Sequence, residues 1–139
     1  MNTVNHGIFA CRPILAVSNV ATSIKYYRDV LGFRVGWAWS DKTNSFLEAN
    51  DESAPSFALV GRDKIQFMLA ETGQGTPGTW LHLDVQTADD LDKLFEEWSN
   101  SVANIIEAPI IRPWGMYEMR IQDLDRNVFR VSSPPREAT

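Results

Sequence analysis

Residues 18–33 read Ser18-Asn-Val-Ala-Thr-Ser-Ile-Lys-Tyr-Tyr-Arg-Asp-Val-Leu-Gly-Phe33, and this stretch carries the signals of one amphipathic helix from cap to stop. Either Ser18 or Asn19 can cap the N-terminus, because each side chain can accept a hydrogen bond from the backbone of the first turn. Gly32 can end the helix, since glycine readily adopts the left-handed conformation that follows a last turn. Apolar residues recur along one face at helical spacing: Val20, Ile24, Tyr27 and Leu31.

The same order of elements occurs in both halves of the chain. A short alternating run precedes each helix, at 12–17 and again at 80–85, and predicts a strand. Thr87 can cap a second helix with apolar residues on one face: Leu91, Leu94, Phe95 and Trp98. Three further strands are predicted after each helix, at 33–40, 57–60 and 64–69, then at 105–111, 116–122 and 128–132.

This repetition predicts a single α+β domain of two tandem βαβββ modules. Module one spans about 12–70 and module two about 79–133, and a frayed tail is expected at 134–139. Polar linkers are predicted at 40–56 and 71–78, where Gly, Pro, Ser and Thr are frequent.

Composition narrows the class of partner. The 139 residues carry a net charge of −5 with a pI near 4.9, which argues against a nucleic-acid-binding surface. The single cysteine, Cys11, cannot form an internal disulfide. Residues 1–10 lack the pattern of a secretory signal, and no apolar run approaches the roughly 20 residues of a membrane span. We therefore expect a cytoplasmic protein with no nucleic-acid or membrane partner.

Two motifs resemble the vicinal oxygen chelate superfamily, which includes glyoxalases, bleomycin resistance proteins and extradiol dioxygenases. Residues 18–33 are similar to its first-helix signature, which ends in Leu-Gly-Phe. Asp123-Leu-Asp-Arg-Asn127 resembles its closing Asp-Pro-Asp-Gly-Asn turn, although Leu124 and Arg126 depart from the Pro and Gly. The resemblance implies curved mixed sheets with helices outside, and a homodimer whose ligand grooves form between subunits.

Within that superfamily the chain looks most like the metal-free bleomycin-resistance branch. The resemblance lies in Pro113-Trp-Gly115, followed by Glu118, and in Leu94-Phe-Glu-Glu-Trp-Ser99 on the second helix. Members of this branch bind their antibiotic without chemical change. The resemblance therefore implies an antibiotic-resistance protein that sequesters a bleomycin-like or other planar compound in an aromatic groove at a dimer interface.

Metal-dependent members of the superfamily commonly hold a divalent ion with two His and two Glu. The matching positions in this chain are Arg12, Gln66, Trp80 and Arg130. An arginine is never deprotonated in a protein and offers no acceptor, and an indole offers only an N–H donor. Gln66 alone would supply one neutral oxygen. We therefore predict no metal site and no cofactor, and expect the usual enzymatic mechanism of the superfamily to be absent.

The same positions supply candidate ligand-binding residues. By resemblance, Trp37 and Trp114 line the groove, while Trp80 fills the vacated metal site and His82 replaces an aromatic residue. The remaining candidates are Gln66, Tyr117 and Arg130. Aromatic rings stack on flat ligands and on cations, so such a groove needs no catalytic group.

Two features of the site stay open in the sequence. Arg12 and Arg130 could favour an anionic ligand, or each could be paired with an acid such as Glu118 or Asp84. A metal-independent enzyme of lyase or isomerase type is a second possible function, with His82 as general base, a role that imidazole groups commonly take near neutral pH. A partner-binding regulatory domain is a third.

Overall fold

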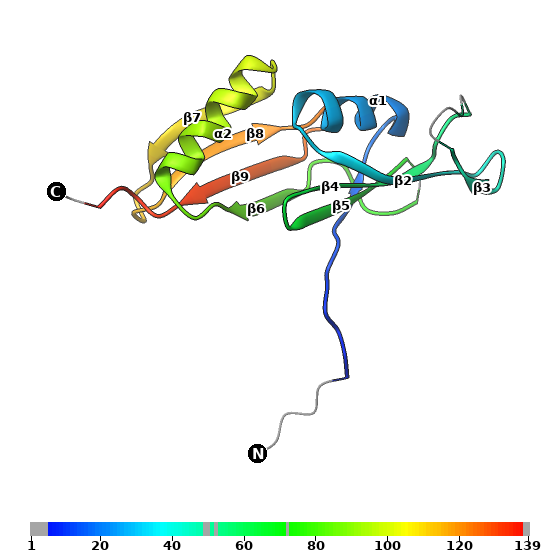
Figure 1. Cartoon of the computed structure of the whole chain (residues 1–139), viewed down its shortest axis with the longest axis horizontal. Coiled ribbons are helices and arrows are strands. Elements are labelled where there is room, and N and C mark those ends of the chain that lie inside the picture. Colours follow the sequence, from blue (N-terminus) through cyan, green and yellow to red (C-terminus); the bar gives the residue numbers. More distant parts are fainter. Residues whose placement is uncertain (1–5, 49–50, 52, 72, 138–139) are drawn as a thin grey trace.

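The computed structural model of the chain describes residues 6–48, 51, 53–71 and 73–137 (Figure 1). Module one contains β1 (Ile14–Ala16), α1 (Val20–Lys25), a π-helical turn (Tyr26–Val30), β2 (Arg34–Ser40), β3 (Ser45–Phe46), β4 (Phe57–Arg62) and β5 (Ile65–Ala70). Module two contains β6 (Trp80–Asp84), α2 (Ala88–Asn100), β7 (Asn104–Ile111), β8 (Tyr117–Gln122) and β9 (Val128–Ser133). The predicted α+β class and the tandem βαβββ order are confirmed.

Each module forms one mixed sheet with the same connectivity. The five-stranded sheet has the order β1-β5-β4-β2-β3, and the four-stranded sheet has the order β6-β9-β8-β7. The first strand of each module pairs in parallel with its last strand, and the other pairs are antiparallel. The helix returns the chain to the end of the sheet where the first strand began, and two antiparallel reversals then give the last strand the same direction as the first.

The first helix begins as predicted but ends differently. Of the two predicted cap residues, Asn19 provides the cap, since its Oδ1 accepts a hydrogen bond from Thr22 N at 2.9 Å. The α-helical geometry ends at Lys25, and the residues up to Val30 continue as a π-helical turn. The apolar spacing does not distinguish a wider final turn from an α-helical one.

The second helix begins as predicted. Thr87 caps α2, with its Oγ1 accepting from Asp90 N at 3.1 Å. Leu91 and Trp98 are buried on the face that turns toward the sheet. Neither described helix is long and apolar enough to cross a membrane.

The segment 40–56, predicted as a linker, contains the short strand β3. Phe46 of β3 pairs with Trp39 of β2, and two residues are too few to show a periodic pattern in the sequence. Within the described part of the tail, Arg136 donates to Asp89 at 3.0 Å near the start of α2. Residues 1–5 and the linker and tail residues 49, 50, 52, 72, 138 and 139 lie outside the described residues.

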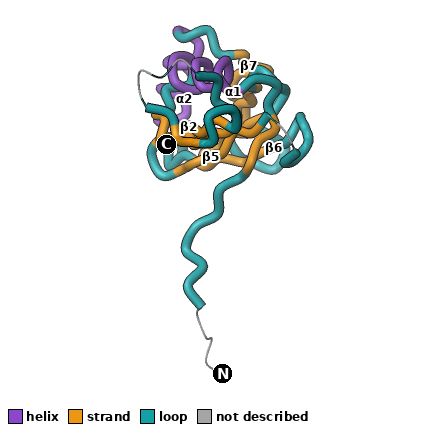
Figure 2. Tube along the Cα trace, turned by 90° about the vertical axis from the view of Figure 1, so that its right-hand side faces the viewer, coloured by secondary structure: helices purple, strands orange, loops and turns teal. Residues whose placement is uncertain are grey.

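Both helices pack on one side of the sheets. Figure 1 and the turned view in Figure 2 show α1 and α2 on the same side of the strands. The opposite side, here called the open face, carries no helix among the described residues. The N-terminal arm, residues 6–13, leaves the domain on the open-face side (Figure 1). The two sheets therefore each keep one face free of the core.

One core joins the two modules beneath the helices. Aromatic rings from both modules are in contact: Phe67 of β5 lies 5.3 Å from Phe129 of β9, and Tyr27 lies 6.1 Å from Phe129, between ring centroids. The Tyr27 hydroxyl also donates to the buried carboxylate of Asp123 at 2.7 Å.

Further hydrogen bonds run from the π-helical turn of module one to the backbone of module two. The Tyr26 hydroxyl donates to Gln122 O at 3.0 Å and accepts from Asn104 N at 3.1 Å. In the other direction, the Trp98 indole N–H donates to Leu31 O at 3.1 Å. Each module thus supplies hydrogen-bond partners to the other.

Candidate functional site

The open face of the four-stranded sheet carries a row of polar side chains. Cross-strand pairing sets His82 opposite Arg130, Arg130 opposite Arg120, and Arg120 opposite Glu107. Residues adjacent to these in the sequence pack in the core: Leu81, Phe129 and Ile121. Because side chains alternate along a strand, the four members of this polar row turn toward the open face.

Glu118 of β8 is the centre of an ion cluster beside this row. Its side chain is 0% exposed. Arg130 donates from Nη2 to Oε1 at 3.0 Å, Arg120 donates from Nε to Oε2 at 3.1 Å, and the Ser132 hydroxyl donates to Oε1 at 2.7 Å. The Nε of Arg112 lies 3.4 Å from Oε2. A buried carboxylate needs such partners to remain charged.

These contacts determine the charge of Glu118. Burial would raise the pKa of this carboxyl, but hydrogen bonds from Arg130, Ser132 and Arg120 outweigh the burial and lower the pKa to about 2. Glu118 is therefore ionised at neutral pH, and it holds two guanidinium groups in fixed positions.

A second carboxylate completes the group. Glu107 of β7 contacts Nη2 of the buried Arg112 and lies 3.9 Å from Nη1 of Arg120. We call Arg112, Arg120, Arg130, Glu107 and Glu118 the arginine cluster. It holds three guanidinium groups and two carboxylates on one side of the sheet.

Two exposed indoles border the arginine cluster. Trp80 is 58% exposed and Trp114 is 56% exposed, which is unusual for the largest apolar side chain. The Arg120 guanidinium carbon lies 5.5 Å from the Trp80 ring centroid, and that of Arg130 lies 5.3 Å from the Trp114 ring. Both separations are within the range of cation–π attraction.

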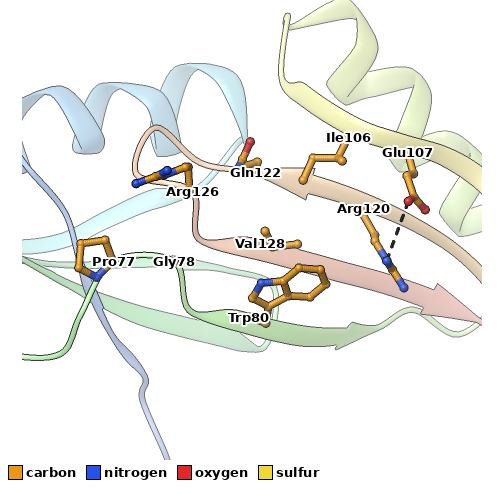
Figure 3. Close-up of a pocket in the computed structure, with 9 residues that line it drawn as sticks. All are labelled: Pro77, Gly78, Trp80, Ile106, Glu107, Arg120, Gln122, Arg126 and Val128. Atoms are coloured by element: carbon orange, nitrogen blue, oxygen red, sulfur yellow. Dashed lines mark ion pairs between the residues drawn. The ribbon is translucent and has the colours of Figure 1, made fainter.

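A shallow cavity of about 420 Å³ lies beside Trp80. Figure 3 shows its nine lining residues, with the Trp80 ring next to the Arg120 guanidinium and the Arg120–Glu107 ion pair at one side. Arg126 and Gln122 lie at the other side of the cavity (Figure 3). The cavity therefore combines one flat aromatic wall with charged and amide groups.

The hairpin between β7 and β8 positions Trp114. Gly115 takes a φ of +94°, a conformation that favours glycine, and its N–H donates to Arg112 O at 2.8 Å. Tyr117 follows this turn but faces the other way. Its hydroxyl donates to Asp92 of α2 at 2.5 Å, and its ring packs against the core on the helix side. The structure thus does not bring the candidate Tyr117 to the open face, because Glu118 occupies that side in the alternation.

Trp37 lies in the five-stranded sheet. It pairs with Leu59 across β2 and β4. It belongs to an aromatic cluster on the open face, with ring centroids 5.0–5.7 Å apart, made up of Trp37, Trp39, Phe46 and Phe57. Five cavities of the described residues are lined by neither Trp37 nor Trp114. The two tryptophans come from different modules of the chain.

The remaining candidates meet where β5 comes close to β6. Arg12 donates from Nε to Gln66 Oε1 at 2.6 Å. Both residues line a cavity of about 390 Å³ together with His82. His82 Nδ1 lies 3.6 Å from an Asp84 carboxylate oxygen, too far for a hydrogen bond. The structure therefore groups Arg12, Gln66 and His82, and pairs Arg130 with Glu118, one of the two alternatives left open for Arg130.

The four positions that match metal ligands in relatives do not suit a divalent ion. Arg12 is bonded to Gln66, and Arg130 to Glu118, while Trp80 covers Arg120. Among the described residues no group of three or more His, Cys, Asp or Glu side chains is arranged to hold a metal. Guanidinium groups at these positions would also repel a cation.

Sequence reasoning missed the central part of this site. Arg112, Arg120 and Glu107 were not candidates, and Glu118 was named only beside the Pro113-Trp-Gly115 motif and as a possible partner of Arg12 or Arg130. The signal was present in the strand alternation, which sets Glu118 and Arg120 on the same face of β8. Alternation alone does not give the register between β8 and β9, and that register brings Arg130 beside Arg120.

The two mixed sheets make this a tandem βαβββ protein. The residues at its four metal-ligand positions differ from the His and Glu side chains common in metal-dependent relatives. A family model described as the Glyoxalase/Bleomycin resistance protein/Dioxygenase superfamily matches residues 5–131, and the chain belongs to this superfamily. No curated protein matches the chain at the level of sequence.

Solved structures share the fold along nearly the whole chain. TioX from Micromonospora sp. ML1 aligns with a TM-score of 0.65 at 16% identity, covering 94% of this chain and 100% of TioX. The bleomycin-binding protein of Streptomyces verticillus, solved with copper(II)-bleomycin, gives 0.63 at 20% identity, covering 94% and 98%. A virulence protein from Salmonella typhimurium gives 0.61 at 21% identity, covering 91% and 98%. At these identities the likeness concerns the fold.

Proposed function

We propose that this protein binds a flat organic molecule reversibly on its open face and does no chemistry on it. The observation that carries the proposal is the pair of half-exposed indoles, Trp80 and Trp114, each stacked on an arginine that Glu118 holds in place. Leaving two indoles in water forgoes the free energy of burying them, about 25 cal/mol per Å² of apolar surface. A flat ligand would recover part of it by stacking.

Membership in the superfamily supports small-molecule binding as the class of function. One structural neighbour is a bleomycin-binding protein. A bleomycin-like or other planar antibiotic is therefore the first ligand to test, with sequestration as the means of resistance. The side chains at the metal-ligand positions do not suit a metal, and this favours binding over the catalysis of metal-dependent relatives.

A homodimer would complete the site. The aromatic cluster around Trp37 and the indoles of Trp80 and Trp114 lie on different sheets, both on the open face, and one chain does not enclose a ligand between them. Phe9 and Ile8 of the N-terminal arm are 93% and 97% exposed on that same side. A second copy placed over the open face would cover these apolar side chains and bring the two sheets together around a groove.

Sedimentation velocity at micromolar protein tests the dimer. A species of twice the 15.7 kDa chain mass is expected, and Phe9→Ser should weaken its association. Lys25→Ser, an exposed substitution on the helix side, is the matched control and should leave the association unchanged. A wild-type monomer across this concentration range would contradict a shared groove.

Binding is tested by isothermal titration calorimetry with bleomycin and a panel of other planar natural products. A saturable signal is expected, and the ligand should be recovered unchanged by mass spectrometry. Trp114→Ala or Trp37→Ala should weaken binding about tenfold, equivalent to about 1.4 kcal/mol. Leu124→Ala, at an exposed apolar residue of the β8–β9 turn, serves as control. Ligand turnover that His82→Ala abolishes would instead establish an enzyme.

A further inference from the structure

The arginine cluster has an unbalanced charge. Arg112, Arg120 and Arg130 face only the carboxylates of Glu107 and Glu118, so the cluster has one more positive than negative charge. This excess stands out in a chain whose net charge is −5. Other charged side chains near the cluster do not reverse it: Arg126 lines the Trp80 cavity, and Asp84 is closest to His82.

Both outer arginines keep hydrogen-bond donors free. Arg130 uses Nε and Nη2 on Glu118, and Arg120 uses Nε on Glu118, with its Nη1 toward Glu107. Within the described part of the chain, Nη1 of Arg130 and Nη2 of Arg120 have no hydrogen-bond partner. The two side chains are 32% and 20% exposed, so these groups are near the surface but partly withdrawn from water.

The two guanidinium groups are already held in place before a ligand arrives. Both are bound to the carboxylate of Glu118, which places them beside each other, and each is covered on one side by an indole. A guanidinium group is a planar fork that matches the two oxygens of a carboxylate. Because its orientation is fixed in advance, little further side-chain entropy is lost on binding.

We propose that the ligand of this site is a flat aromatic anion, with its ring against Trp80 or Trp114 and its carboxylate on the free donors of Arg120 and Arg130. The inference rests on the proposed function and narrows the ligand from any flat compound to an anionic one. A cationic compound would be repelled by the excess positive charge of the arginine cluster. The site therefore favours a negatively charged ligand, whereas a metal site at the matching positions would bind a cation.

Three probes with the same naphthalene ring, similar size and different charge test this inference: 2-naphthoate, the neutral 2-naphthamide, and 2-naphthylmethylammonium. Isothermal titration calorimetry of the full chain at pH 7.5 and low salt should show 2-naphthoate binding at least tenfold more tightly than 2-naphthamide. The ammonium probe should bind most weakly. Raising the salt concentration to about 0.3 M should reduce the preference for the anion, since salt screens exposed charges.

Two variants locate the effect. Arg120→Gln should remove most of the preference for 2-naphthoate over 2-naphthamide. Lys25→Gln removes an equal charge from the exposed helix side and should leave the preference intact. Circular dichroism and thermal unfolding show whether each variant is folded.

The outcomes separate the two proposals. If all three probes bind with equal affinity, the charge inference is overturned while reversible binding of flat molecules stands. If the ammonium probe binds most tightly, the inference is likewise overturned. If no probe binds at millimolar concentration and the natural-product panel also fails, the proposed function fails, and this inference fails with it.

Discussion

Replacing Glu118 with glutamine should destabilise the protein in a way that depends on pH. The substitution keeps the size of the side chain and its ability to accept one hydrogen bond, but it removes the buried negative charge. Arg112, Arg120 and Arg130 would then face a single carboxylate, that of Glu107. Removing one partner of a buried ion pair is more destabilising than removing an exposed pair, because the remaining charges lose their compensation.

The size of the effect follows from the pKa of Glu118. The pKa falls from 4.5 to about 2 on folding. Each pKa unit corresponds to about 1.4 kcal/mol, so the ionised carboxylate contributes about 3 kcal/mol to the free energy of unfolding. A depressed pKa stabilises the fold above the unfolded-state value of 4.5, and this stabilisation is lost as the pH falls toward about 2.

Urea unfolding followed by tryptophan fluorescence measures this contribution. At pH 7, Glu118→Gln should lower the free energy of unfolding by about 3 kcal/mol. With a slope of about 1.5 kcal/mol per molar urea, the midpoint should fall by about 2 M. At pH 3 the wild type has lost much of the stabilisation that the ionised carboxylate provides. The difference in free energy of unfolding between wild type and variant should therefore shrink to about 1 kcal/mol.

The matched control is Glu96→Gln, at an exposed carboxylate on α2, which should change the free energy of unfolding by less than about 0.5 kcal/mol at either pH. A loss below about 1 kcal/mol for Glu118→Gln at pH 7 would show that the arginine cluster does not stabilise the ionised carboxylate. A difference that stays constant between pH 7 and pH 3 would refute the pKa assignment.

Substitutions at four further positions are checked by the same unfolding measurement. Gly32→Ala should lower the free energy of unfolding by about 2 kcal/mol, because φ is +76° and the new Cβ would lie 2.6 Å from a guanidinium nitrogen. Gly115→Ala, with φ +94° and open space around the new Cβ, should lower it by only about 1 kcal/mol. Equal losses for the two variants would contradict the steric argument. Tyr27→Phe removes a hydrogen bond to the buried Asp123 and should cost about 2 kcal/mol; a neutral result would mean that this bond contributes nothing net. Asn19→Ala removes the α1 cap and should cost about 1 kcal/mol, whereas Asn19→Ser should retain most of the stability.

The fold could be predicted because its signals are local. Thr87 and Asn19 cap helices by bonds within one turn, and alternation along each run indicated the strands without any knowledge of their pairing. The predicted boundaries of helices and strands were wrong where tertiary contacts determine them. The helix changes to a π-helical turn at Tyr26, where the side chain bonds to module two. The strand β3 is too short to show periodicity.

The candidate site was predictable only in part, for a related reason. Resemblance named Trp80 and Arg130 as candidates, because the matching positions lie in their own strands, but their contacts with Arg120 and Glu118 come from the neighbouring strand β8. Arg112 and Glu107 come from β7 and its hairpin, where the pairing of β7 with β8 contains register shifts; there Glu107 contacts Arg112, which in turn lies beside Glu118. Those irregularities leave no pattern in the sequence. The candidate Tyr117 precedes Glu118 in β8, so alternation turns it to the helix side, where its hydroxyl donates to Asp92.

The hydrogen bonds from the π-helical turn across to module two have a consequence for folding cooperativity. Without module two, Tyr27 would lose its carboxylate acceptor and the rings of module one would lose Phe129. Neither half of the repeat can therefore complete its interior alone, although each has a full set of strands. The chain should unfold in a single transition, and amide hydrogens of β5 and β9 should exchange with solvent at the same global rate.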